Sequence, residues 1–141
     1  MLRRSQFERR SASSAVEAAI VFPIAFLLLL GLMSGGMGIF RYQEVASLAR
    51  EGSRWAAVHG SQYALDTGNA AATAKDVYDN AILPKVVGLD TSKLSYQVTW
   101  NPDKQPPNST VTVTVSYQWS PEVYLFGTFT LTSTSTMAMS Y

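Results

Sequence analysis

The chain has no cysteine and only one histidine, His59, among its 141 residues. Without cysteine it can form neither a disulfide nor a thiolate metal site. The sequence also lacks a phosphate-binding loop, a glycine-rich nucleotide turn and any spacing typical of metal ligands. Asp76 and Asp79 stand three residues apart on a predicted helix, but no histidine or third carboxylate accompanies them. We therefore expect a protein that is not an enzyme and that uses no cofactor and no metal.

Charged residues are few and unevenly placed. They make up 15% of the chain, with a net charge of +1. Residues 1–12 hold four arginines, whereas Glu122 is the only charged residue after Lys104. Because no basic patch occurs outside residues 1–12, the sequence does not favour nucleic acid as a partner. The last third is rich in Thr, Ser and Val, which is typical of β-strands with a neutral hydroxyl face.

The longest apolar run, Ala18–Phe40, has 23 residues and no charge. A helix of about 20 apolar residues spans a bilayer core, so the run predicts a transmembrane segment at 18–40. A cleaved secretory signal is the alternative, but its apolar region is usually only about 7–15 residues long. The arginines before the run predict a cytoplasmic N-terminus. The chain then crosses the membrane once, and in a bacterium its C-terminal domain would be periplasmic or extracellular.

Two features within the run have structural meaning. Pro23 lacks an N–H group and is expected to kink the helix. Gly31 and Gly35 form a small-xxx-small pair, which permits close packing against other membrane helices. Glycine is also common in membrane helices without such a role, so the spacing alone leaves both interpretations open.

The helix is predicted to continue beyond the membrane. After Arg41, apolar and small residues recur at helical spacing and form one stripe. The stripe consists of Val45, Leu48, Ala49, Gly52, Trp55, Ala56 and His59. Arg41 and Glu44 are predicted to form an i,i+3 ion pair on the solvent-exposed face of the helix. The pattern predicts one helix over residues 13–59, with a packed histidine near its end.

The remaining residues predict a small domain that covers the stripe. A loop is expected over 61–69, followed by a helix over 70–83 with Asn69 as its N-cap. Alternating residues predict strands at 94–100, 110–119 and 128–141. The expected fold is α+β, with a long membrane-spanning helix, a second shorter helix and a three-stranded antiparallel sheet. The organisation is a basic cytoplasmic leader at 1–12, the long helix at 13–59, and an extracytoplasmic α/β domain at 60–141.

Glu17 stands one residue before the apolar run. A carboxylate there is costly unless it stays in the headgroup region or finds a partner. The structural interpretation is that it lies among headgroups and interacts with the positive end of the helix dipole. The functional interpretation is that it pairs with a group on another chain.

Residues 9–54 resemble the signature segment of TadE-like pilus-assembly proteins, the minor pseudopilins of tight-adherence (Flp-type) pilus systems. The features that carry the resemblance are the basic leader, Ser14-Ala15-Val16-Glu17, Val21-x-Pro23, the Leu-rich run ending in glycines, and Ala49-Arg50-Glu51-Gly52-x-Arg54. The resemblance covers about a third of the chain. Two positions depart from the family pattern: Ala12 stands where glycine is usual, and Ala18 stands where an aromatic residue is common.

The resemblance implies a pilin-like fold, a location in the bacterial inner membrane, and a defined route of processing and assembly. A prepilin peptidase would cut between Ala12 and Ser13, which would remove all four leader arginines. Glu17 would then set the register of assembly by pairing with the N-terminal amine of a neighbouring subunit. The implied partners are the inner membrane, the peptidase, other pilin-like subunits and pilus-assembly membrane proteins. The alternative function is a single-pass anchored binding module whose outer domain recognises a surface polymer or a protein.

Overall fold

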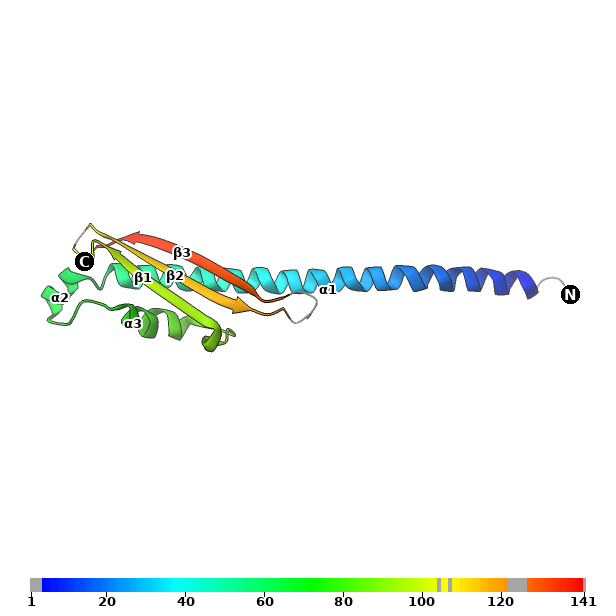
Figure 1. The fold of residues 1–141 in the computed structure, drawn as a ribbon, viewed down its shortest axis with the longest axis horizontal. Coiled ribbons are helices and arrows are strands. Elements are labelled where there is room, and N and C mark those ends of the chain that lie inside the picture. Colours follow the sequence, from blue (N-terminus) through cyan, green and yellow to red (C-terminus); the bar gives the residue numbers. More distant parts are fainter. Residues whose placement is uncertain (1–3, 104, 107, 122–126, 141) are drawn as a thin grey trace. The chain divides into compact units, whose positions relative to one another are not determined.

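The computed structural model describes residues 4–103, 105–106, 108–121 and 127–140, with side chains from Ser14 onward. The chain divides into two compact units, Met1–Met37 and Gly38–Tyr141, which are described separately here as unit 1 and unit 2. Unit 1 is helical, and unit 2 combines helices with a three-stranded antiparallel sheet (Figure 1). The predicted α+β fold with a long N-terminal apolar helix is therefore confirmed.

Helix α1 runs from Arg4 to Ala57 and passes through Pro23 without a break. It begins earlier than the predicted Ser13, because the residues that precede Ser13 include good helix formers such as Arg, Gln, Glu and Ala. It ends two residues before His59. There the N–H of His59 donates to the carbonyl of Ala56 at 3.2 Å, a tighter i,i+3 bond that closes the last turn.

The sheet contains β1 (Leu94–Asn101), β2 (Thr110–Trp119) and β3 (Phe129–Ala138), paired antiparallel in the order β1-β2-β3. Strand β2 lies in the centre and alternates strictly between its two faces, as its sequence predicts. Its inward residues are all buried, which makes this strand the centre of the core. They are Val111, Val113, Val115, Tyr117 and Trp119.

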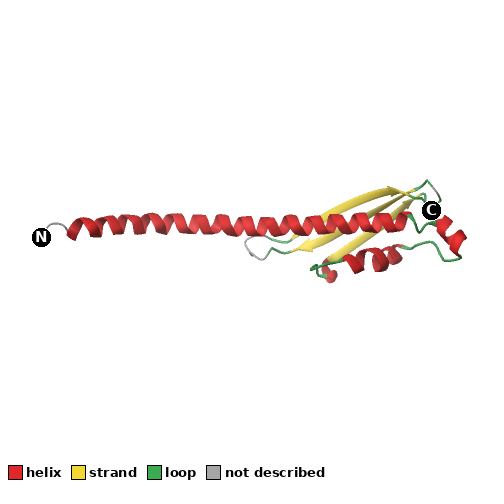
Figure 2. Cartoon of the chain, turned by 180° about the vertical axis from the view of Figure 1, so that it is seen from behind, coloured by secondary structure: helices red, strands yellow, loops and turns green. Residues whose placement is uncertain are grey.

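The part of α1 in unit 2 packs across the inner face of the sheet, on the same side as α3 (Figures 1 and 2). Val45 and Ala49 are fully buried, and Leu48 is nearly so. At Gly52 the backbone approaches β2 so closely that an added Cβ would lie 3.1 Å from Cγ1 of Val113. The predicted helix stripe is therefore the surface that covers the sheet.

The outer face of the sheet carries paired hydroxyl groups instead of charges. Side chains of β2 and β3 meet across the strands at hydrogen-bonding distance. The pairs are Thr112–Thr136 at 2.9 Å, Thr114–Thr134 at 3.0 Å and Ser116–Thr132 at 2.9 Å. The neutral hydroxyl face expected from the sequence is thus present, and these hydroxyls bond to one another.

The segment after α1 differs from the prediction of a loop. Residues Ser61–Thr67 form a short helix, α2, which ends at Gly68 with a left-handed backbone at φ 73°. The N–H of Gly68 donates to the carbonyl of Ala64 at 3.0 Å, and glycine suits this position because it has no Cβ to clash. The expectation of a loop over 61–69 is wrong, because the turn-forming residues there act as the end of a helix.

The second predicted helix is shorter and less regular than expected. Helix α3 spans Ala74–Val77, and a π-helical turn at Tyr78–Ile82 and a 3-10 turn at Leu83–Lys85 follow it. Its N-cap is Thr73, whose hydroxyl accepts from the N–H of Asp76, while the Asp76 carboxylate accepts from the N–H of Thr73 at 2.9 Å. This reciprocal capping box starts the helix later than the predicted cap at Asn69.

Candidate functional site

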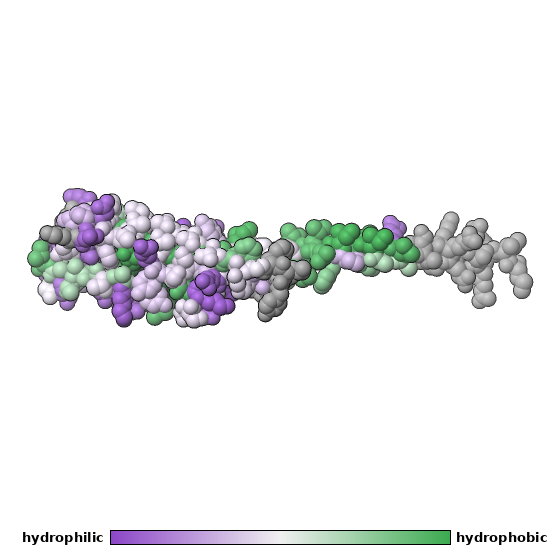
Figure 3. Space-filling model, viewed as in Figure 1, coloured by the Kyte–Doolittle hydropathy of each residue, from purple (hydrophilic) through white to green (hydrophobic). Residues whose placement is uncertain are grey.

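The first unit presents an almost fully exposed apolar helix surface. From Ser14 to Met33 nearly every side chain is exposed; Phe22 is 70% and Leu32 is 73% accessible. Most of this surface is green, the colour of hydrophobic residues, in Figure 3. Within the described chain this is the one helix long and apolar enough to cross a membrane. So large a contiguous apolar patch requires a covering medium, and a bilayer core has the matching length.

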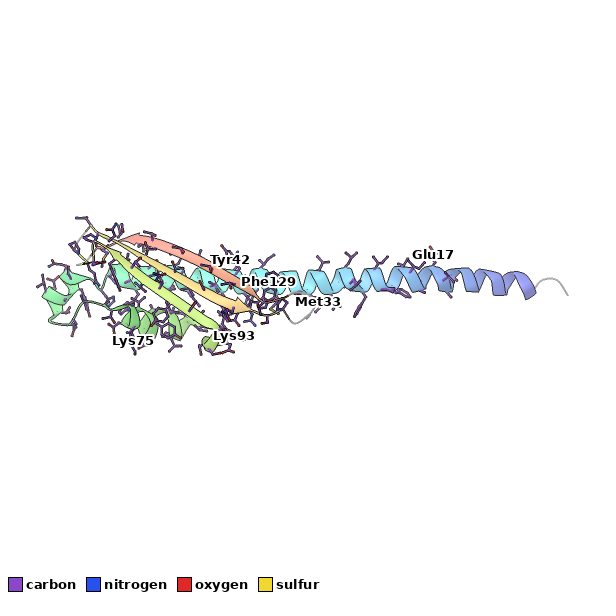
Figure 4. The ribbon with its side chains drawn as sticks, viewed as in Figure 1. Glu17, Met33, Tyr42, Lys75, Lys93 and Phe129 are labelled. Atoms are coloured by element: carbon purple, nitrogen blue, oxygen red, sulfur yellow. The ribbon has the colours of Figure 1, made fainter. Side chains whose placement is uncertain are left out.

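Glu17 lies at the N-terminal border of this apolar surface. Its side chain is exposed and projects from α1 (Figure 4). The structure shows no hydrogen bond or ion pair between Glu17 and another described residue. The predicted processing site, Ala12–Ser13, lies one helical turn earlier within α1, and the side chains there are outside the described part.

The glycines of α1 fall into two groups. Among the described residues, a Cβ added to Gly31 or Gly35 would meet no atom within 4 Å. At Gly38 and Gly52, by contrast, side chains of the chain's own sheet and helices fill the space. No described side chain packs at Gly31 and Gly35, whereas the two later glycines serve the fold of unit 2.

Arg41 and Glu44 do not form the predicted ion pair. Instead, both side chains reach the loop that follows the second helical segment. The Glu44 Oε1 atom accepts from the N–H of Val87 at 2.8 Å, and the Arg41 guanidinium donates to the carbonyl of Gly88. The backbone of Gly88 is left-handed, at φ 70°. The two side chains thus fix this loop against α1, a contact that no local spacing could have indicated because its partners lie more than forty residues away.

His59 has a structural environment. Its ring stacks on the ring of Trp55, with centroids 3.9 Å apart. The ring of Tyr63 also lies close to it in a tilted arrangement, with centroids 4.6 Å apart. Its Nδ1 atom is 2.8 Å from the Trp55 carbonyl oxygen, which can only accept, so Nδ1 carries the proton. Within the described residues no group of three or more His, Asp or Glu side chains could hold a metal ion. The packed histidine expected at the helix end is what the structure shows.

The segment from the predicted cut at Ala12–Ser13 to Arg54 lies entirely on α1. Residues 12–54 match the family model of TadE-like proteins. The match confirms the resemblance seen in the sequence, and it includes Glu17, Pro23, Gly31 and Gly35. No curated protein and no solved structure gives a significant match to the chain.

The TadE-like segment extends across both units. It begins before the exposed apolar surface, passes through it, and ends in the stretch of α1 that packs on the sheet. The segment and the apolar helix together fit a membrane protein of pilus assembly with a single anchor. The role of Gly38 was not recognised from the sequence, because its partner, Trp119, is distant in the chain and only the fold brings the two together.

Proposed function

We propose that the chain is a minor pseudopilin of a tight-adherence pilus or a related secretion system, anchored in the bacterial inner membrane. The observation that carries this proposal is the position of the TadE-like segment on one helix. The first half of that helix is exposed and apolar, and the second half is covered by the chain's own sheet. A subunit of this kind can fold its outer unit independently while its apolar half contacts lipid or other helices.

In this proposal, prepilin peptidase cuts between Ala12 and Ser13. Residues 1–12 contain four arginines and one glutamate, so the cut removes a net charge of +3. It also creates a new positive amine on Ser13, one helical turn, or about 6 Å, before Glu17. The mature helix then begins with an amine and a carboxylate in adjacent turns, instead of with a basic leader that keeps it on the cytoplasmic side.

Glu17 then pairs with the Ser13 amine of a neighbouring subunit. Its exposure and its lack of a partner among the described residues support this role. In a medium of low dielectric constant an unpaired carboxylate is strongly unfavourable, and an amine at hydrogen-bonding distance offsets that cost. Neighbouring subunits are therefore held at one relative height, and Gly31 and Gly35 permit their helices to approach closely.

Glu17→Gln tests this role, because it keeps the shape of the side chain and removes its charge. We expect normal membrane insertion but a loss of association with neighbouring subunits on the order of a hundredfold or more, as for a broken buried ion pair. The measurement is crosslinking and co-purification from cells that express the assembly system. Asp103→Asn, at an exposed position of unit 2, is the matched control. Wild-type association of the Glu17→Gln variant would exclude the pairing.

The anchored binding module receives less support from the outer sheet face. The hydroxyls of β2 and β3 there bond to one another at 2.9–3.0 Å, so they are partly occupied already. A module of that kind would retain binding in a form that lacks the helix and would not require Glu17. The same Glu17→Gln variant therefore distinguishes the two functions.

A further inference from the structure

The end of the apolar run is physically tied to a distant loop of unit 2. The run ends at Phe40, and α1 continues through Arg41 and Glu44, which lie within about 6 Å of that end along the helix axis. Glu44 accepts from the N–H of Val87, and Arg41 donates to the carbonyl of Gly88. These bonds hold the 87–88 loop at the level where the apolar run ends.

The loop places an apolar side chain at this level. Val87 is 72% exposed although it is bonded through its backbone to α1. Its N–H is used by Glu44, so the fold fixes the direction of the side chain while leaving it uncovered. An isolated exposed valine needs no explanation, but here other exposed apolar side chains lie at the same level.

A third segment, the start of β3, reaches the same level. The ring of Phe129 lies 6.2 Å from that of Trp119, and Trp119 in turn lies over Gly38. Phe129 is 47% exposed and Tyr42 is 46% exposed. Figure 4 shows Tyr42, Phe129 and Lys93 toward the same end of unit 2. We call four of the exposed apolar and aromatic residues of this end the collar; they are Phe40, Tyr42, Val87 and Phe129.

The charges near the collar suit a headgroup layer. Lys93 is exposed one residue before β1, and Arg41 lies on α1. Two described carboxylates near the collar accept hydrogen bonds within the protein: Glu44 accepts from the N–H of Val87, and Asp90 accepts from the N–H of Ser92 at 3.0 Å. Aromatic residues and cationic side chains are enriched where proteins cross the membrane surface, because their apolar parts lie in the boundary and their polar parts remain wet.

We propose that the collar rests in the headgroup region of the bilayer, so that unit 2 contacts the membrane through Val87 and Phe129 as well as through α1. The occupant of this surface is lipid. The inference rests on the proposed function only in taking residues 18–40 as the membrane span. Contact at three separate segments restricts rotation of unit 2 about the axis of α1, which presents one side of the sheet consistently to neighbouring subunits.

The absence of cysteine permits a direct test. Single variants Val87→Cys, Leu32→Cys and Leu65→Cys carry a nitroxide label in the full chain, reconstituted in vesicles of phosphatidylethanolamine and phosphatidylglycerol at 3:1. Leu32 is 73% exposed within the apolar run, and Leu65 is 78% exposed on α2. Collision rates with oxygen and with a water-soluble nickel chelate report depth. We expect the label at position 87 to be at least several-fold less accessible to the chelate than the label at 65.

The three labels separate the possible failures. A lipid-like signal at Leu32 with a water-like signal at Val87, equal to that at Leu65, would overturn the collar and leave the anchor intact. A water-like signal at Leu32 would instead remove the membrane span and the proposed function with it. Phe129→Cys provides a second collar position if the label at 87 disturbs the loop, and it must give the same depth as Val87. Because the vesicles contain no other protein, shielding at both positions identifies lipid as the occupant.

Discussion

Trp119 lies directly over Gly38, so that a Cβ added to this glycine would stand 2.8 Å from Cζ3 of the indole ring. The indole is 9% exposed and belongs to the core cluster of unit 2. The ring therefore has little freedom to move away. The glycine lets α1 pass beneath the end of β2, and this contact joins the end of the apolar run to the sheet.

Gly38→Ala should destabilise unit 2 by about 1–3 kcal/mol, the usual cost of inserting a methyl group into a filled space. The free energy of unfolding is measured by urea titration of the full chain in detergent, with the near-ultraviolet circular dichroism of the tryptophans as the signal. Gly36→Ala is the control, because nothing lies within 4 Å of its added Cβ and alanine favours the helix. Equal stability of the two variants would show that Trp119 does not depend on Gly38.

Ser53 and Ser135 form a partly buried hydroxyl pair between α1 and β3, with oxygens 2.8 Å apart. Ser53 is fully buried and also donates to the carbonyl of Arg50 at 2.9 Å, so Ser135 is the donor to Ser53. We expect Ser53→Ala and Ser135→Ala to be non-additive, with a coupling of about 0.5–1.5 kcal/mol in a double-mutant cycle. The exposed pair Thr112–Thr136 is the control and should show a smaller coupling. Simple additivity at Ser53 and Ser135 would contradict the hydrogen bond.

The capping box of α3 should make stability depend on pH. The hydroxyl and the backbone N–H of Thr73 both donate to the Asp76 carboxylate. These two hydrogen bonds, of which the hydroxyl's has the larger effect, lower the pKa of Asp76 below its usual value. Because the pKa of Asp76 is lower in the folded state than in the unfolded state, ionised Asp76 stabilises the fold at pH values above its unfolded-state pKa of about 3.9. This stabilisation is lost as the pH falls through the folded-state pKa. Wild type should therefore exceed Asp76→Asn in stability at neutral pH, with the difference shrinking below about pH 4. A difference that does not change with pH would exclude the carboxylate as its source.

The open glycines of unit 1 should matter for association and not for folding. Gly31→Leu and Gly35→Leu fill space in which no described atom of the chain lies within 4 Å of the added Cβ, so the unfolding transition of unit 2 should not change. Association with other helices should weaken, because the bulky side chains keep backbones apart. Energy transfer between labelled chains and neighbouring subunits in vesicles measures this effect. Gly36→Leu, on another side of the helix, is the control; equal loss in all three variants would assign the effect to bulk alone.

Local patterns in the sequence predicted the parts of the fold that depend on local periodicity. Val45, Leu48 and Ala49 recur at helical spacing and are buried, and β2 alternates as its sequence requires. Helix α2 was missed because its polar sequence has no apolar stripe and ends in turn-forming residues. The π-helical turn after Val77 was missed because the register of a helix can change without a signal in composition.

The candidate site was predictable for a different reason. Glu17, Pro23 and the glycines stand in an ordered set along one helix, and the family match covers that set. The contacts of Arg41 and Glu44 with the 87–88 loop, and of Gly38 with Trp119, depend on residues far apart in the chain. Such contacts follow from the tertiary fold alone, so the collar could be recognised only in the structure.

A pseudopilin of the proposed kind is processed at its N-terminus before it is assembled. The most direct test is the mass of its N-terminal peptide, isolated from membranes of cells with an active prepilin peptidase and from matched cells with an inactive one. We expect a chain that begins at Ser13 in the first case and retains residues 1–12 in the second. An N-terminus that still carries residues 1–12 beside the active peptidase would contradict it.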